Sequence, residues 1–201
     1  MMNSIKKNLT LLAVLILAAS SIALTQMEAT GWNIDKSHSS IDFSVRHFFT
    51  PVNGTFNDYN ATVNFDPANL AESNLDVEVM ISSVDTKNEK RDGHLLTGDF
   101  FDAETYPKMM FKSVKIEAAG ENQFVAHGDL TIKDVTKRVE LPFQLLGVMD
   151  HPRREGVKIA GISSSLVIDR NDYGVGTGGY AETAVIGGEV TINLNLELTT
   201  K

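Results

Sequence analysis

Cysteine is absent from this 201-residue chain, and basic residues are scarce. Without a thiol the chain can form no disulfide, cysteine nucleophile, cysteine-based zinc site or iron–sulfur cluster. Lysine and arginine number 18 against 26 aspartate and glutamate residues, which gives a formal net charge of −8. Proteins that follow the phosphate backbone of nucleic acids normally carry the opposite charge, so no nucleic-acid partner is expected.

Long hydrophobic runs are also absent, except near the N-terminus. Two lysines at 6–7 precede an apolar run at 9–19, and a small-x-small sequence follows it. This order is typical of a secretory signal peptide. An uncleaved anchor is the alternative, but the run of about 11 to 15 residues is shorter than the roughly 20 that span a bilayer. We expect residues 1–23 to be removed near Ala23, leaving 24–201 as one exported domain without a stable membrane span.

The rest of the chain is dominated by a period of two. At the C-terminal end, Val190, Ile192 and Leu194 alternate with Thr191 and Asn193. This pattern is typical of a strand with one apolar and one solvated face. Six segments alternate clearly: 40–46, 59–65, 74–82, 124–133, 138–145 and 190–198. Two more segments, 108–117 and 157–169, alternate weakly.

About eight long strands separated by turn residues predict an all-β domain. A closed antiparallel barrel is favoured because it leaves no exposed strand edge. A two-sheet sandwich is the alternative, although its strands are usually shorter. In a barrel of this size the inward side chains either fill the core or line a cavity, and composition does not choose between these outcomes.

One segment, 85–107, lacks the alternation and is rich in charge. A short helix is expected from Asn88 to Leu96, ended by Thr97-Gly98. We expect this segment to lie across one end of the barrel.

Two glycine- and serine-containing motifs resemble catalytic or nucleotide-binding signatures only superficially. Residues 174–179 match G-x-G-x-x-G, but no strand precedes them and no helix follows, so a loop between strands is expected. Residues 161–165 fall one glycine short of G-x-S-x-G and lie inside a predicted strand. The histidines show no metal-ligand spacing, so neither a metal nor a cofactor is expected.

The densest group of titratable side chains is Arg91, Asp92 and His94, with Asp85 and Asp99 nearby. These residues either form a polar mouth that orients a ligand headgroup or satisfy one another within a charged loop. Catalysis is a further alternative, for example by a metal-assisted hydrolase using 85–107, but no nucleophile–base pair is evident.

Motifs along the whole expected mature chain carry a resemblance to a known family. The opening reads W-x-I-D-x-x-H-S-x-I-x-F-x-V-x-H over 32–47. Further matches are Ser83-Val84-Asp85-Thr86, Arg91-Asp92-Gly93-His94-Leu95, Asp99-Phe100-Phe101-Asp102, Tyr106-Pro107, Phe111-x-Ser113, Gly128-x-Leu130-Thr131-Ile132 and Ile168-Asp169-Arg170-x-Asp172-x-Gly174. In this order, these motifs resemble those of the YceI-like family. Gly93 and Thr97 depart from the residues frequent there, which affects the shape of the mouth.

The resemblance implies an extended, eight-stranded, antiparallel, lipocalin-like barrel in the bacterial periplasm. It also implies a partner that is a long apolar chain, an isoprenoid or similar lipid such as a polyprenyl phosphate or a quinone, with a possible homodimer. We therefore expect a non-enzymatic carrier with no catalytic residue. A stress-induced barrel with a filled core is an alternative, as is the hydrolase.

Two sets of candidate ligand-binding residues follow. The candidate apolar wall comprises Phe43, Val45, Val77, Val79, Ile81, Phe111, Leu130, Ile132, Leu141 and Phe143. The candidate polar mouth comprises His38, Asp85, Arg91, His94 and Arg170. Both arginines could pair with a phosphate, but they could equally neutralise neighbouring aspartates.

Overall fold

The computed structural model describes residues 29–181 and 183–200. The expected signal peptide, residues 1–23, lies outside this part of the chain, so its cleavage stays a prediction. Within the described residues no helix is long and apolar enough to cross a membrane.

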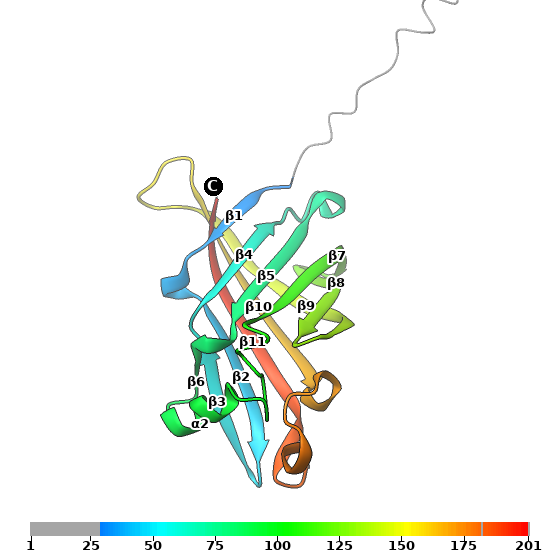
Figure 1. The fold of residues 1–201 in the computed structure, drawn as a ribbon. Coiled ribbons are helices and arrows are strands. Elements are labelled where there is room, and N and C mark those ends of the chain that lie inside the picture. Colours follow the sequence, from blue (N-terminus) through cyan, green and yellow to red (C-terminus); the bar gives the residue numbers. More distant parts are fainter. Residues whose placement is uncertain (1–28, 182, 201) are drawn as a thin grey trace, which may run out of the picture.

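The described chain is built mainly of strands (Figure 1). They are β1 (Gly31–Ile34), β2 (Ser40–His47), β3 (Thr50–Phe56), β4 (Tyr59–Asn64), β5 (Asn74–Met80), β6 (Val84–Asp85), β7 (Lys108–Gly120), β8 (Gln123–Ile132), β9 (Val135–Asp150), β10 (Lys158–Asp169) and β11 (Ile186–Thr200). The α-helix is α2 (Glu89–Leu95), and the 3₁₀ turns are η1 (Lys36–His38), η2 (Leu70–Glu72), η3 (Ile81–Ser83), η4 (Arg170–Tyr173) and η5 (Gly178–Ala181).

Eight of the strands form a closed antiparallel barrel in the order β1-β4-β5-β7-β8-β9-β10-β11, which a pairing between β1 and β11 closes. The expected barrel is thereby confirmed. The strands β2, β3 and β6 extend from the other part of β11, because that strand pairs with β1 near its C-terminal end and with β2 over Ile186–Asn195.

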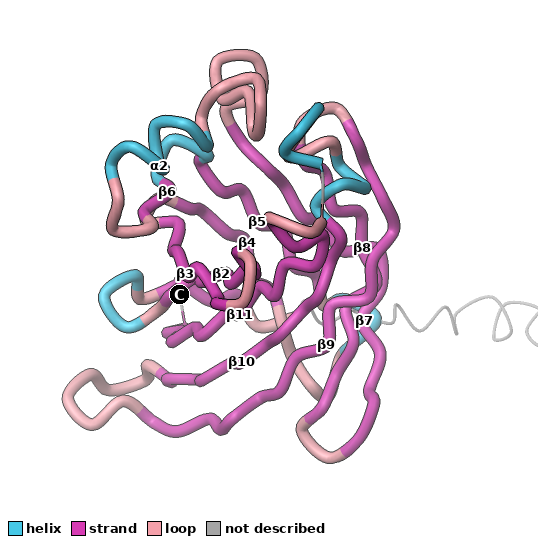
Figure 2. Tube along the Cα trace, turned by 90° about the horizontal axis from the view of Figure 1, so that it is seen from below, coloured by secondary structure: helices cyan, strands magenta, loops and turns pink. Residues whose placement is uncertain are grey.

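Helix α2 lies where the sequence predicts a short helix. The Asn88 side chain accepts a hydrogen bond from the Arg91 amide (3.1 Å) and so caps the first turn. The helix ends at Leu95, and the amide of the capping residue Leu96 donates to the Asp92 carbonyl (3.3 Å). Figure 2 views the molecule from this end, with the strands curling round in a ring and α2 at the edge of that ring.

The part of the barrel near β1 is filled by side chains. Phe65 is 2% exposed, and its ring centre lies 5.0 Å from that of Phe124 and 5.3 Å from that of Phe143. The Trp32 indole nitrogen donates to the Phe65 carbonyl (2.8 Å) and ties β1 to this group. We call Phe65, Phe124 and Phe143 the aromatic plug. A smaller apolar cluster, formed by Ile41, Phe56, Tyr59, Val79, Ile81 and Val84, joins β2 and β3 to β5.

Candidate functional site

A pocket of about 610 Å³ opens at the end of the barrel that carries α2. Its walls come from β2, β3 and β11, from α2, from the loop residues at 100–101, 175, 179–180 and 185, and from one residue each of β7, β8 and β10. Most of the lining is apolar: Phe43, Val45, Val52, Phe56, Leu95, Phe100, Phe101, Met109, Ile132, Ile168, Val175, Tyr180, Val185, Ile186, Val190 and Ile192. This volume and lining are typical of sites for small apolar ligands.

The strand alternation places one wall of the pocket. Phe43 pairs with Ile192 and Val45 pairs with Val190 across β2 and β11, so their side chains share one face. On the other side of β2, Phe43 pairs with Gly54 of β3. A Cβ atom at Gly54 would collide with the Phe43 ring, so the glycine lets that ring lie flat against β3.

Three residues of the candidate apolar wall line this pocket: Phe43, Val45 and Ile132. The other seven lie in the packed core instead: Val77, Val79, Ile81, Phe111, Leu130, Leu141 and Phe143. Alternation indicates that a side chain points inward, but it does not indicate how far along the barrel it lies. The barrel is filled near β1 and hollow near α2. Five of these seven belong to or pack against the filled part, whereas Val79 and Ile81 belong to the smaller cluster that joins β2 and β3 to β5.

The polar rim of the pocket comes largely from the segment that includes α2. Thr86, Asn88, Lys90, Arg91 and His94 contribute to it. Arg91 Nε donates to Thr86 Oγ1 (2.6 Å), and Arg91 Nη2 donates to the Thr86 carbonyl (2.8 Å). These two hydrogen bonds hold the guanidinium at the rim of the pocket. Both acceptors are uncharged oxygens of Thr86, so neither contact neutralises the positive charge of Arg91.

His94 joins α2 to the loop on the opposite side of the pocket. Its Nε2 lies 3.0 Å from Asp99 Oδ2, and its ring meets Phe100 (5.1 Å between ring centres) and Tyr180 (4.9 Å) edge to face. Phe100 and Tyr180 also contact each other at 5.2 Å. These rings bridge α2 and η5 across one side of the pocket.

Arg170 lines the pocket but is turned to the backbone, and it is only 5% exposed. Its guanidinium donates to the carbonyls of Gly187 (2.8 Å), Val175 (2.7 Å) and Ile186 (3.0 Å). Burial lowers the pKa of this group, and the nearby Asp169 carboxylate partly offsets the effect.

Glycine at 176 is required by that packing. Gly176 has a φ of +92°, and a Cβ there would collide with Arg170 Nη1. The G-x-G-x-x-G sequence is therefore a loop folded around a buried guanidinium, in agreement with the loop predicted at 174–179.

Two candidate mouth residues, His38 and Asp85, lie outside the pocket lining. Asp85 accepts a hydrogen bond from the Lys87 amide (2.7 Å). His38 Nδ1 lies 3.0 Å from Asp35 Oδ2 and 3.7 Å from Glu197 Oε1. The hydrogen bond between His38 and Asp35 lowers the pKa of Asp35 and raises the pKa of His38, with Glu197 adding to the latter.

The charged segment 85–107 satisfies much of its own hydrogen bonding. Asp92 Oδ1 accepts from the Thr86 amide (3.0 Å) and hydroxyl (2.5 Å). Within the described chain, the group of three side chains whose arrangement suits a metal ion is Asp35, His38 and Glu197, which lies outside this segment. No such three-ligand group lies among the described residues of 85–107.

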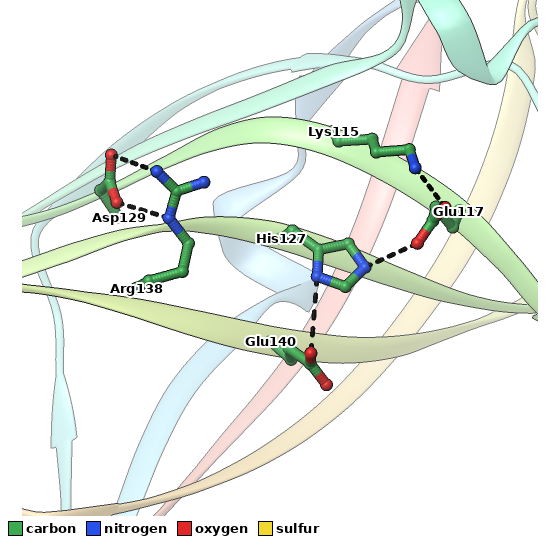
Figure 3. Close-up of polar contacts among 6 residues, drawn as sticks. All are labelled: Lys115, Glu117, His127, Asp129, Arg138 and Glu140. Atoms are coloured by element: carbon green, nitrogen blue, oxygen red, sulfur yellow. Dashed lines mark hydrogen bonds and ion pairs between the residues drawn. The ribbon is translucent and has the colours of Figure 1, made fainter.

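A separate polar network covers the outer face of β7, β8 and β9 (Figure 3). His127 Nε2 lies 2.9 Å from Glu117 Oε2, and Arg138 pairs with Asp129 at 2.8 Å. The hydrogen bond from Lys115 lowers the pKa of Glu117, with His127 contributing less. These exposed pairs lie on the outer face and are absent from the pocket lining.

Sequence reasoning missed the pocket residues that lie in α2 and in the loops. Leu95 of α2 and the loop residues Phe101, Val175 and Val185 follow no period-two pattern, so alternation gives no sign of them. Val190 and Ile192 carried a usable signal, since they alternate clearly within 190–198.

The fold and the pocket together define a small antiparallel β-barrel that is closed by eight strands and carries a mainly apolar pocket at one end. The chain belongs to the YceI-like domain family, whose model matches residues 32–198.

Comparisons with individual proteins agree with this assignment. A UPF0312 protein of Vibrio cholerae is 32% identical over 169 residues, which cover 83% of this chain and 88% of the relative. The crystal structure of BcnA from Burkholderia cenocepacia matches with a TM-score of 0.74 at 28% identity and covers 82% of this chain and 99% of that one. A polyisoprenoid-binding domain from Saccharophagus degradans matches with a TM-score of 0.63 at 16% identity, covering 86% of this chain and 99% of that domain, and shows the shared fold.

Proposed function

We propose that this protein is a non-catalytic carrier that holds the apolar chain of an isoprenoid or similar lipid in the pocket at the α2 end of the barrel. The observation that carries the proposal is a pocket of about 610 Å³ with a mainly apolar lining and a polar rim at one side. A neighbour of the same fold is described as a polyisoprenoid-binding domain, which supports this ligand class.

The pocket volume limits how much of a chain can be enclosed. At ~30 Å³ for each water-sized group, about 610 Å³ takes roughly 20 non-hydrogen atoms, or about four isoprene units. Each buried methylene contributes about 0.8 kcal/mol, part of which is lost in ordering a flexible chain. A longer lipid would leave its remaining units outside the pocket.

The polar rim suits the headgroup end of such a ligand. Lys90 and Arg91 lie at the rim, with His94 beside them. An anionic group such as a phosphate would find cationic donors there, and a quinone ring would find hydrogen-bond donors and the rings of Phe100 and Tyr180.

The test is native mass spectrometry of the protein purified from its own host, followed by extraction and identification of any bound molecule. Val45→Trp, on the pocket wall, should abolish the bound mass while leaving the fold stable. Val79→Trp is the matched control, because Val79 is 6% exposed in a packed cluster and does not line the pocket. Overpacking there should lower the free energy of unfolding by about 1–3 kcal/mol while the folded protein keeps its ligand. Retention of the ligand by a folded Val45→Trp variant would rule out this pocket.

We further propose that the carrier acts in the periplasm after removal of residues 1–23. The support is the N-terminal sequence, in which a basic pair precedes a short apolar run. N-terminal sequencing of protein from the periplasmic fraction should begin close to residue 24, and a chain that keeps its N-terminus in the membrane fraction would contradict the proposal.

A further inference from the structure

The turn between β2 and β3 presents two adjacent phenylalanines to solvent. Phe48 is 50% exposed and Phe49 is 96% exposed, the highest value among the large hydrophobic side chains of the described chain. We call this pair the aromatic tip. Two neighbouring exposed aromatic rings on one turn are a feature that usually marks an interaction site.

The aromatic tip is held in a fixed conformation. The Phe48 amide donates to the Val185 carbonyl (2.7 Å), and the Arg46 guanidinium donates to the carbonyls of Phe48 and Thr183. Phe48 has a φ of +50°, in the left-handed region that is sparsely populated by bulky residues. The contacts of Arg46 and Val185 support this conformation, so little ordering is needed for the tip to bind.

The tip projects from the rim of the pocket. His47, directly before it, and Val52, shortly after it, both line the pocket, as do Val185 and Ile186 on the facing segment. In Figure 1 the β2–β3 turn lies at the lower end of the drawn molecule, next to the orange-red segment that leads into β11. Whatever binds the tip therefore also lies close to the pocket opening.

We propose that the aromatic tip inserts into the interface of a lipid bilayer and brings the pocket opening against the membrane. Two aromatic side chains bury at most about 300–500 Å² together, below the roughly 800 Å² per partner of a stable protein interface. Single aromatic rings, by contrast, are stable at the headgroup level of a bilayer. Docking there would let a lipid pass between the membrane and the pocket. This role of the tip rests on the proposed function.

Charge at the same end makes a smaller contribution. Lys87 and Lys90 are exposed beside or on α2 and favour anionic headgroups, while the exposed Glu89 between them offsets part of this attraction. The aromatic rings therefore provide the main attachment. Binding to uncharged phosphatidylcholine vesicles is expected to persist at high salt, since insertion of apolar rings is not screened.

The experiment places a fluorescent probe at the tip of the full mature protein. In Phe49→Trp, phosphatidylcholine vesicles should shift the tryptophan emission to the blue, and brominated phosphatidylcholine should quench it. The native Trp32 is only 6% exposed and gives a constant background. Leu146→Trp on β9 is the matched control, because Leu146 is 62% exposed yet lies outside the tip, and its emission should not change.

A second variant measures the contribution of the rings. Phe48→Ser/Phe49→Ser should weaken co-sedimentation with vesicles at least tenfold while circular dichroism and the unfolding midpoint stay unchanged. Binding of a lipid supplied in detergent solution should persist, because neither phenylalanine lines the pocket, so loss of docking and loss of ligand binding are distinguishable.

Two results would overturn the proposal. In the first, the tryptophan emission of the Phe49→Trp variant stays unshifted at saturating vesicle concentration. In the second, the double serine variant sediments with vesicles as the parent protein does. A self-association that disappears in that variant, with no vesicle binding by either protein, would instead assign the tip to a protein interface.

Discussion

At the scale of single residues, the same side-chain chemistry serves two purposes at this end of the barrel. Arg91 and Arg170 were equivalent candidates in the sequence, since each stands beside an aspartate. The structure separates them: Arg91 lies at the pocket rim, whereas Arg170 is buried with its donors directed to three backbone carbonyls. The sequence contains no periodicity that marks this difference, because it depends on where the fold places the carbonyls of Val175, Ile186 and Gly187.

Replacing Arg170 by lysine should therefore destabilise the fold. A lysine ammonium cannot reach all three carbonyls from one position, and a buried acceptor left without a donor costs about 1–3 kcal/mol. We expect Arg170→Lys to lower the free energy of unfolding by about 2–4 kcal/mol, measured from the midpoint of urea denaturation. The control is Arg138→Lys, in an exposed pair with Asp129, which should cost at most about 1 kcal/mol. Equal midpoints for the two variants would show that Arg170 does not stabilise the loop.

At the scale of elements, alternation identified the long strands, and it failed where strands are short or interrupted. Each of the eight predicted segments corresponds to a strand, from β2 to β11. The missed strands are β1, which has four residues, β6, which has two, and β3, in which Pro51 and Gly54 interrupt the pattern. Helix α2 lies within the predicted range, Asn88 to Leu96. The pocket depends on β3 and on loops, so its full lining was not predictable from the alternation.

Gly54 offers a test of the β2–β3 pair as one side of the pocket. A Cβ at this position would collide with the Phe43 ring and would lie 2.9 Å from Thr86 Cγ2. We expect Gly54→Ala to push the Phe43 ring into the pocket, reducing ligand occupancy by at least half, at a cost of about 1–3 kcal/mol in stability. Native mass spectrometry and urea denaturation measure the two effects.

The control for this substitution is Gly98→Ala, where the added Cβ meets nothing within 4 Å. It should leave both ligand occupancy and stability unchanged. If Gly54→Ala keeps full occupancy, the Phe43 ring does not limit the pocket.

At the scale of the whole molecule, the barrel combines a packed half with a hollow half. The aromatic plug and its neighbours provide the apolar core near β1, and the pocket lies toward α2. The sequence could not distinguish an open interior from a filled one, since both give inward-facing apolar side chains on every strand. In this arrangement stability and binding depend on different residues, and substitutions in the two halves should separate them.

Phe65→Ala tests this division directly. Phe65 is 2% exposed, contacts both other rings of the plug and does not line the pocket. Its truncation should lower the free energy of unfolding by about 3–5 kcal/mol, because it removes buried apolar surface and leaves a cavity. Ligand occupancy below the unfolding temperature should be unchanged. Val45→Trp should instead abolish ligand occupancy and leave the free energy of unfolding unchanged. If Phe65→Ala instead increases the length of the chain that is bound, the plug limits the depth of the pocket, and the two halves form one continuous interior.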